Sequence, residues 1–496
     1  MTDAAPPVSL RRNIAANYLG RAYSMGANYL FIPFYVAILG VEAYGVIAFY
    51  AVLLTITGLA DVGLSATFSR EAARQQDPAQ LIRLLATAER ILLAAAAGCA
   101  LVIFLGAGWF AEHWLNSTDA LGTAAMVWPL RLMALMLVPQ LLIALYSAGL
   151  LGLQRQVKAN GIQAAFITVR AGLVILPILW RPDLTLFFGW QLAATLAFAV
   201  ITRMALVRAM GLGSFATARF DYAALRPHLH YAGGMLAIII ISTVNTQLDK
   251  LIVSNLFSIA EFGYYSLASA LAQIPPAIST PVAVALFPSL TANIAQGRAD
   301  LERAHYQHYG AIISFLAALS AVGLALFSRE LTAIWLPRTD LPASFETVVS
   351  VLALGSLFLC LQMPSYYLSL AHGSYKIVVV FASITLAFSV PLTIYLTSQY
   401  GVVGAAAPWL ILNVTNFGML CYLINRRYYA GSHLNWLWRY SLGPAATAAT
   451  PLVAARFIAD RAETGVIANC IIAAIAAACA CAAFGTFAMG RARTAS

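Results

Sequence analysis

Six ionisable side chains stand inside long apolar segments of this 496-residue chain, where they could bind charged groups or ions. The cations are Arg21, Arg131, Arg170 and Lys250, and the acids are Asp61 and Asp249. A charge at the centre of a membrane helix costs about 2.5–3.5 kcal/mol on insertion scales, so such residues should face water or the protein interior. Guanidinium groups bind phosphate through two parallel hydrogen bonds, and a buried carboxylate can take up a proton or Na⁺.

Three of these positions also have a purely structural interpretation. Arg131 follows Trp128 and Pro129 and could extend to the outer headgroups. Asp61 could cap a helix or pair with the adjacent loop, and Asp249 could pair with its neighbour in sequence. The alternative role for both acids is to couple the uptake of an ion to transport.

Arg21 and Arg170 are harder to explain by extension to the membrane surface. Arg21 lies eight residues past Asn13, roughly 12 Å inward along a helix. Arg170 falls near the middle of its apolar segment. We therefore expect both guanidinium groups to face a water-filled cavity.

Uncharged polar residues recur at helical spacing near these charges and complete a candidate cavity lining. They are Asn17, Asn28, Asn245, Gln273, Gln362, Tyr366 and Asn413. Gln273 precedes Pro275 and Pro276, which must bend or break the helix and free carbonyl groups. The same polar residues could instead hold neighbouring helices together, and the bend could be architectural.

About fourteen apolar segments position these residues, each near the ~20 residues that span a bilayer core. We place them at 13–39, 43–66, 88–110, 122–150, 160–180, 184–207, 231–255, 261–287, 309–328, 346–371, 377–398, 402–425, 440–458 and 465–488. The chain is 61% hydrophobic and 10% charged, whereas a soluble domain has roughly a quarter of its residues charged. The predicted fold class is an all-α polytopic membrane protein.

Basic residues are distributed unevenly between the loops on the two sides. Of the 29 Lys and Arg residues, 20 fall on one side, five on the other and four inside segments. Short loops rich in Lys and Arg stay cytoplasmic, which predicts a multi-pass protein with cytoplasmic N- and C-termini. A nucleic-acid-binding surface would be clustered on one domain, so the net charge of +10 does not indicate that partner.

A weak internal repeat suggests two lobes of six helices. The turns at 39–45 and 257–263 each end in an aromatic-glycine pair that opens the next helix. We expect an N-terminal lobe at 1–210, a cytoplasmic linker at 211–230, a C-terminal lobe at 231–426 and a final helix pair with a tail at 427–496. Two such pseudo-symmetric lobes would enclose a central cavity.

Motifs for covalent chemistry are not found in the sequence. It contains no GxxxxGK[ST], GxSxG or HExxH pattern, and its six cysteines lack the spacing of metal ligands. We therefore predict no catalytic residue, metal or cofactor, beyond a coupling H⁺ or Na⁺.

An ordered set of short stretches resembles the Wzx-type polysaccharide (O-antigen) flippases of the multidrug/oligosaccharidyl-lipid/polysaccharide (MOP) exporter superfamily. They include Asn17-Tyr18-Leu19-Gly20, Pro33-Phe34-Tyr35, Tyr44-Gly45, Asp61-Val62-Gly63-Leu64, Arg70-Glu71, Gly149-Leu150-Leu151-Gly152, Asn245-Thr246-Gln247-Leu248-Asp249-Lys250, Gly263-Tyr264-Tyr265-Ser266, Leu286-Phe287-Pro288 and Tyr400-Gly401-Val402-Val403-Gly404. The match extends in order over most of residues 10–425.

The resemblance implies two six-helix lobes around a cationic cavity that moves an undecaprenyl-pyrophosphate-linked oligosaccharide to the outer leaflet by alternating access. It places Arg21, Arg170, Lys250 and Arg131 in that cavity. It also implies membrane lipids, a polysaccharide polymerase and a chain-length regulator as partners. Other cargoes within the superfamily are drug-like cations and the peptidoglycan lipid precursor. A membrane polymerase or ligase is an alternative of another class, although no large outer loop supports it.

Overall fold

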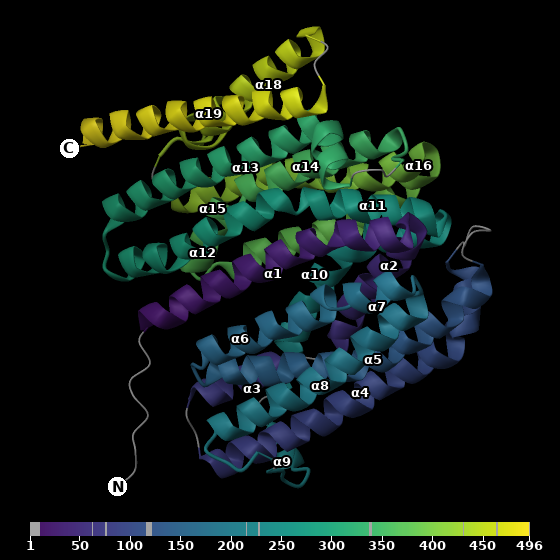
Figure 1. The fold of residues 1–496 in the computed structure, drawn as a ribbon. Coiled ribbons are helices and arrows are strands. Elements are labelled where there is room, and N and C mark those ends of the chain that lie inside the picture. The colour runs from purple at the N-terminus through teal and green to yellow at the C-terminus, as the bar shows by residue number, and fades with distance from the viewer. Residues whose placement is uncertain are drawn as a thin grey trace. The chain divides into compact units, whose positions relative to one another are not determined.

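The described part of the chain consists of helices joined by turns and short irregular connections, as the sequence predicts. The structure is a computed structural model (Figure 1). It describes residues 10–61, 63–74, 77–115, 122–214, 216–226, 229–336, 340–429, 431–462 and 465–495. Its contacts divide the chain into two units, Met1–Gln247 with Ser254–Gly263, and Leu248–Val253 with Tyr264–Ser496. The predicted lobe boundaries and linker stay predictions.

The first unit contains the helices up to α9 and most of α10. They are α1 (Leu10–Leu39), α2 (Val41–Thr57), the 3₁₀ turn η1 (Gly58–Asp61), α3 (Leu64–Ala73), α4 (Pro78–His113), α5 (Thr123–Gly152), α6 (Gln156–Ile167), the π-helical turn η2 (Thr168–Gly172), α7 (Ile175–Trp180), α8 (Leu184–Ala209), α9 (Tyr222–Leu225) and α10 (Leu229–Leu256). Helices α4, α5 and α8 pack side by side around fully buried residues such as Leu85, Leu145 and Leu206. This core fixes the frame on which α1, α6 and η2 are arranged.

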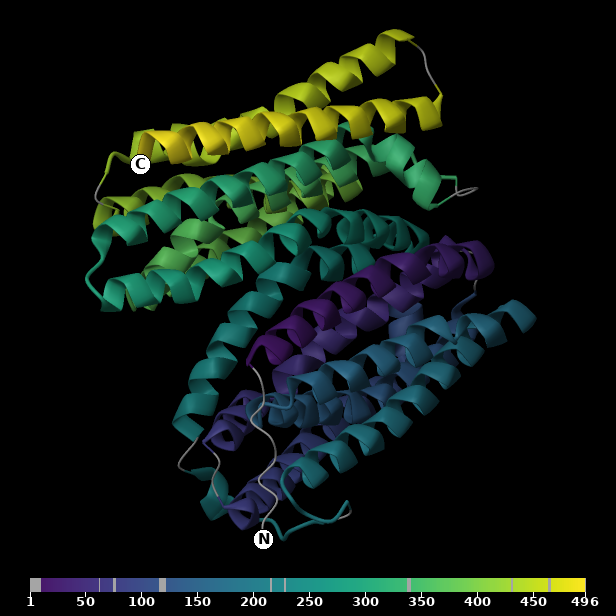
Figure 2. The ribbon, with the colours of Figure 1, turned by 60° about the vertical axis from the view of Figure 1, so that its left-hand side comes forward.

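The second unit contains the helices from α11 onward. They are α11 (Ile259–Ala272), whose first residues belong to the first unit, α12 (Ile274–Ala295), α13 (Ala299–Trp335), α14 (Ser344–Leu361), α15 (Met363–Ala371), α16 (Tyr375–Tyr428), α17 (His433–Trp436), the π-helical turn η4 (Leu437–Leu442), α18 (Gly443–Ala462) and α19 (Val466–Ala495). The core includes Leu286, Ile313 and Ile424, all fully buried. Helices α18 and α19 lie alongside α13, as Figure 1 and Figure 2 show.

Within the described residues, eleven helical segments are long and apolar enough to cross a membrane. They are Val41–Asp61, Pro78–His113, Thr123–Gly152, Gln156–Trp180, Leu184–Ala209, Ile259–Ala295, Ala299–Trp335, Ser344–Ala371, Lys376–Tyr428, His433–Ala462 and Val466–Thr486. Helix α1 adds the shorter apolar stretch Tyr23–Leu39. Lys376–Tyr428 covers two predicted segments, because the chain turns at Gly401, whose φ is 62°. The predicted number of about fourteen is therefore approximate, and the multi-pass class is confirmed.

The predicted break at Gln273 is confirmed. Helix α11 ends at Ala272 and α12 begins at Ile274, with prolines in its first turn. Proline lacks an amide hydrogen and is tolerated in the first turn of a helix, so Pro275 and Pro276 predict that a helix begins here.

Two glycines allow the start of α2 to cross the start of α11 at backbone contact. A Cβ atom on Gly45 would lie 2.2 Å from the carbonyl oxygen of Ile259, and one on Gly263 would lie 2.6 Å from that of Val41. These are the two aromatic-glycine turns that echo each other in the sequence. Glycine is required because any larger residue would separate the helices.

Candidate functional site

Arg170 lies in a π-helical turn that interrupts the segment Gln156–Trp180. The amide of Leu173 donates to the carbonyl oxygen of Thr168, five residues back, at 2.9 Å. A π-helical turn inserts one residue into an α-helix and is frequent at functional sites. Its insertion shifts the two flanking helical stretches relative to each other by roughly 100°, one residue's rotation in an α-helix.

Side chains from two other helices satisfy three consecutive carbonyl groups of this turn. Trp190 Nε1 donates to the carbonyl oxygen of Val169 at 2.9 Å, and Gln191 Nε2 donates to that of Arg170 at 3.3 Å. The Tyr35 hydroxyl donates to the carbonyl oxygen of Ala171 at 2.5 Å. Trp190 and Gln191 belong to α8, and Tyr35 belongs to α1. The turn is thus held from both sides by donors outside its own helix.

A fourth bond connects α1 to the start of the turn. The oxygen atoms of the Tyr23 hydroxyl and of Thr168 Oγ1 are 2.5 Å apart. Because Thr168 Oγ1 donates its own hydrogen to the carbonyl oxygen of Ala164, the tyrosine must be the donor. The Tyr23 side of α1 therefore lies against the start of the turn that carries Arg170.

The Arg170 guanidinium has no acidic partner among the described residues. Its carbon Cζ lies 5.2 Å from the ring centre of Phe166, and its Nε is buried without a hydrogen bond. A half-buried guanidinium on an aromatic face, with terminal nitrogens that make no hydrogen bond here, can bind an anion through two parallel bonds.

Arg131 occupies a different environment on α5. Its guanidinium carbon lies 5.3 Å from the Phe104 ring centre and 5.1 Å from that of Trp128, which is 56% exposed. Its Nε is buried without a hydrogen bond. Aromatic residues at a helix end favour the headgroup boundary, so these contacts fit the structural interpretation as well as an anion site.

Asp61 caps the helix that follows it. Its carboxylate accepts hydrogen bonds from the Ser65 amide at 3.1 Å and from the Ser65 hydroxyl at 2.7 Å. A carboxylate at a helix N-terminus satisfies otherwise free amides and interacts favourably with the helix dipole. The capping role is therefore present in the structure beside the predicted role in ion coupling.

Asp249 and Lys250 lie next to each other in the second unit and interact. The ammonium nitrogen of Lys250 is 3.6 Å from Asp249 Oδ1, and the Tyr265 hydroxyl donates to Asp249 Oδ2 at 2.7 Å. Both side chains are about one-fifth exposed, at 21% and 20%. Lys250 is therefore paired with a carboxylate, whereas Arg170 has no acidic partner among the described residues.

The uncharged candidates fall into separate environments. Gln362 and Asn413 are buried and bonded to each other, with Gln362 Nε2 donating to Asn413 Oδ1 at 3.1 Å. Tyr366 is 36% exposed, Gln273 is exposed at the helix junction and Asn245 is half-buried. The side chains of Arg21, Asn17 and Asn28 on α1 lie outside the described residues. Within the first unit, the structure brings the turn that carries Arg170 together with Tyr23 and Tyr35 of α1 and with Trp190 and Gln191 of α8.

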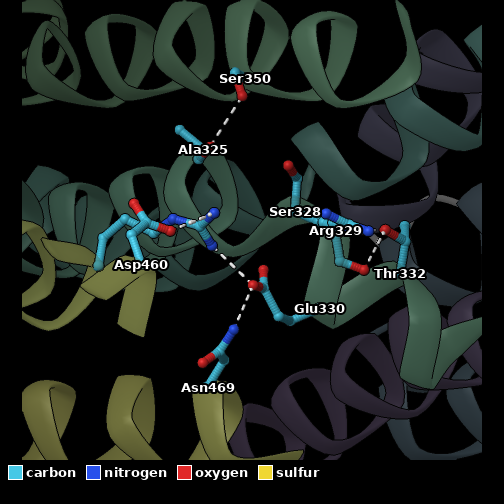
Figure 3. Close-up of polar contacts among 9 residues, drawn as sticks. Ala325, Ser328, Arg329, Glu330, Thr332, Ser350, Asp460 and Asn469 are labelled. Atoms are coloured by element: carbon cyan, nitrogen blue, oxygen red, sulfur yellow. Dashed lines mark hydrogen bonds and ion pairs between the residues drawn. The ribbon is translucent and has the colours of Figure 1, made fainter. Parts of the chain in front are cut away.

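A buried ionic cluster that the sequence reasoning missed attaches the C-terminal helix pair to α13 (Figure 3). Glu330 Oε1 accepts from Arg456 Nη1 at 2.7 Å and from Asn469 Nδ2 at 2.9 Å. Arg456 Nη2 also lies 3.0 Å from Asp460. The Glu330 side chain is 4% exposed, and its Oε2 makes no hydrogen bond. Glu330 lies just beyond the predicted segment 309–328, and its partners follow more than a hundred residues later.

Comparisons with known proteins agree with this architecture. The sequence profile described as polysaccharide biosynthesis protein matches residues 10–293. A Shigella flexneri protein that its name assigns to O-antigen transport is 24% identical over 397 residues, covering 78% of this chain and 91% of the relative.

Two solved structures share the fold. The lipid II flippase MurJ in an inward closed conformation has a TM-score of 0.70 at 13% identity, covering 95% of this chain and 98% of its own. An inward-facing multidrug resistance MATE family transporter of the MOP superfamily has a TM-score of 0.61 at 13% identity, covering 83% and 96%. The predicted MOP-type helical fold is confirmed.

Proposed function

We propose, from the premise that the chain belongs to the polysaccharide biosynthesis protein family, that it is a flippase for a lipid-linked oligosaccharide. The cargo is an undecaprenyl-pyrophosphate-linked repeat unit of O-antigen or another surface polysaccharide. The protein moves it from the cytoplasmic to the periplasmic leaflet by alternating access, without making or breaking a covalent bond. The family membership, the MOP-type fold and the O-antigen relative support this proposal.

The observation that carries the proposal is the unpaired guanidinium of Arg170. A cation within the apolar segment Gln156–Trp180 costs about 2.5–3.5 kcal/mol, and no acid in the described residues offsets that cost. A pyrophosphate would offset it, since its oxygens accept the two parallel hydrogen bonds that guanidinium offers. A passing anionic headgroup therefore explains why an arginine stays at this position.

The remaining candidates have proposed roles around the same cargo. Arg21, Lys250 and Arg131 are further cationic contacts, and Asp61 and Asp249 are the sites for a coupling H⁺ or Na⁺. The polar residues lining the cavity are Asn17, Asn28, Asn245, Gln273, Gln362, Tyr366 and Asn413. The Asp249–Lys250 pair suits a coupling role because protonation of the acid would remove the negative charge that faces the lysine ammonium.

Location and partners follow from the same proposal. The protein resides in the bacterial inner membrane with both termini in the cytoplasm, since basic loops stay inside. Two lobes, 1–210 and 231–426, joined by the linker 211–230, rock around the cargo, and the helix pair with its tail occupies 427–496. A polysaccharide polymerase and a chain-length regulator receive the flipped unit.

Two other cargoes fit the fold. The likeness to MurJ raises the peptidoglycan lipid precursor, which also carries a pyrophosphate, as the second candidate. Drug-like cations fit less well, because Arg170, which has no acidic partner among the described residues, would repel them. An enzymatic polymerase or ligase is disfavoured because the Shigella flexneri relative is named a transporter of O-antigen and the fold is shared with solved flippase and MATE transporter structures.

A deletion strain tests the proposal. Loss of long-chain surface polysaccharide, with lipid-linked units accumulating on the cytoplasmic leaflet, is the expected result. Normal polysaccharide with altered drug sensitivity would contradict it. Depletion that stops peptidoglycan synthesis while surface polysaccharide persists would identify the lipid precursor as cargo.

A further inference from the structure

The hydrogen bonds around the π-helical turn are directed at the backbone that carries Arg170. In an α-helix the carbonyl of Val169 would accept from the amide of Leu173, but that amide donates to Thr168 instead. The turn therefore leaves carbonyl groups that need other donors, since an unpaired buried carbonyl is unfavourable. Tyr35, Trp190 and Gln191 supply three of them.

Two of these three donors are buried side chains, and the third, Trp190, is partly buried. Tyr35 and Gln191 are each 6% exposed. Tyr35 is further fixed by an edge-to-face contact with the ring of Phe187, whose centre lies 5.2 Å away. Donors immobilised by packing favour one backbone conformation over another, because little further entropy is lost in making the bonds.

We propose that Tyr35, Trp190 and Gln191 are positioning residues for Arg170. By stabilising the π-helical turn they set the direction in which the guanidinium points, and without them the segment relaxes toward a regular α-helix that turns it away by up to ~100°. Tyr35 acts from α1, so the orientation of Arg170 depends on the placement of that helix. This inference rests on the proposed function, because it assigns Arg170 as the contact for the anionic headgroup.

A double-mutant cycle separates positioning from a general structural role. Surface polysaccharide is measured in the deletion strain carrying wild-type protein, Tyr35→Phe, Arg170→Lys or both, at matched membrane levels. Tyr35→Phe removes only the hydroxyl, and we expect a ~2- to 10-fold lower polysaccharide signal, as for the loss of one hydrogen bond. In the Arg170→Lys background the same change should have little further effect, since lysine lacks the directional fork.

Gln191→Leu and Tyr50→Phe extend the comparison. Gln191→Leu should behave like Tyr35→Phe, because it also removes a donor to the turn. Tyr50 is the matched control: its hydroxyl is buried in the same unit but makes no hydrogen bond, so Tyr50→Phe should transport at the wild-type level.

Each outcome decides between the two proposals. If Arg170→Gln transports normally, the proposed anion contact is wrong. If Arg170→Gln abolishes transport while Tyr35→Phe and Gln191→Leu remain at the wild-type level, the positioning inference is overturned and the proposed function stands. The positioning inference is also overturned if Tyr35→Phe lowers the polysaccharide signal by the same factor in the wild-type and Arg170→Lys backgrounds. Equal factors would mean that the effect of the Tyr35 hydroxyl does not depend on Arg170.

Discussion

Replacing Arg456 by Gln should loosen the C-terminal helix pair from α13 more than replacing Glu330 by Gln. The two side chains form one ion pair, but their surroundings differ. Glu330 is 4% exposed, whereas Arg456 is 29% exposed and also contacts Asp460. Without Arg456, the buried carboxylate of Glu330 loses its counter-charge. Without the charge of Glu330, Arg456 still contacts Asp460 and solvent.

The magnitudes follow from this asymmetry. Breaking a buried ion pair from one side costs about 3–5 kcal/mol when the remaining charge stays buried. For Arg456→Gln we expect the free energy of unfolding to fall by about 3 kcal/mol. This is the low end of the range, because Asn469 still donates to Glu330 at 2.9 Å. For Glu330→Gln we expect a loss of about 1.5 kcal/mol, the low end of the contribution of hydrogen bonds to a charged group.

The double variant Glu330→Gln/Arg456→Gln should be more stable than Arg456→Gln alone, because it leaves no unpaired buried charge. Asp460→Asn is the matched control: Asp460 is 57% exposed, so its loss should change stability by less than about 1 kcal/mol. The thermal unfolding midpoints of the purified proteins, measured in one detergent, rank the variants by stability. Equal midpoints for the two single variants, or a double variant less stable than Arg456→Gln, would refute the reasoning.

Three further changes test other parts of the structure. Gly45→Ala should strongly reduce the yield of protein in the membrane, because its Cβ would lie 2.2 Å from a backbone oxygen of α11. Gly98 has open space around it, so Gly98→Ala should express normally. Equal yields of the two variants would contradict the close crossing of α2 and α11. Thr87→Val should expose the loop before α9 to protease, since the Thr87 hydroxyl accepts from the Asp221 amide at 2.9 Å; an unchanged cleavage rate would show that this bond does not hold the loop. Asp61→Asn keeps a cap on α3, so loss of transport at normal yield supports ion coupling, whereas normal transport leaves Asp61 only its capping role.

The helical segments could be predicted from the sequence because hydropathy and proline positions are local signals. The junction at Gln273 falls where prolines predict a break inside the segment 261–287, and the turn at Gly401 falls between the predicted segments 377–398 and 402–425. The charged candidates were also identifiable, since a cation such as Arg170 is conspicuous in an apolar segment.

The partners of those charges could not be predicted in the same way. The π-helical turn depends on donors from α1 and α8, and no local pattern indicates that Tyr35 reaches a carbonyl group 136 residues away. Glu330 was missed because it lies at the end of an apolar segment, where a charge is unremarkable, and its partners are 126 and 139 residues distant. Tertiary hydrogen bonds of this kind come from packing and not from periodicity.

The most direct test of the account measures where lipid-linked oligosaccharide accumulates when Arg170 is changed. In the deletion strain, Arg170→Gln at wild-type membrane level should leave the lipid-linked units on the cytoplasmic leaflet, and Arg170→Lys should restore part of the flux because it keeps the charge. If Arg170→Gln delivers units to the periplasmic leaflet at the wild-type rate, an unpaired guanidinium in this segment is not what carries the headgroup across.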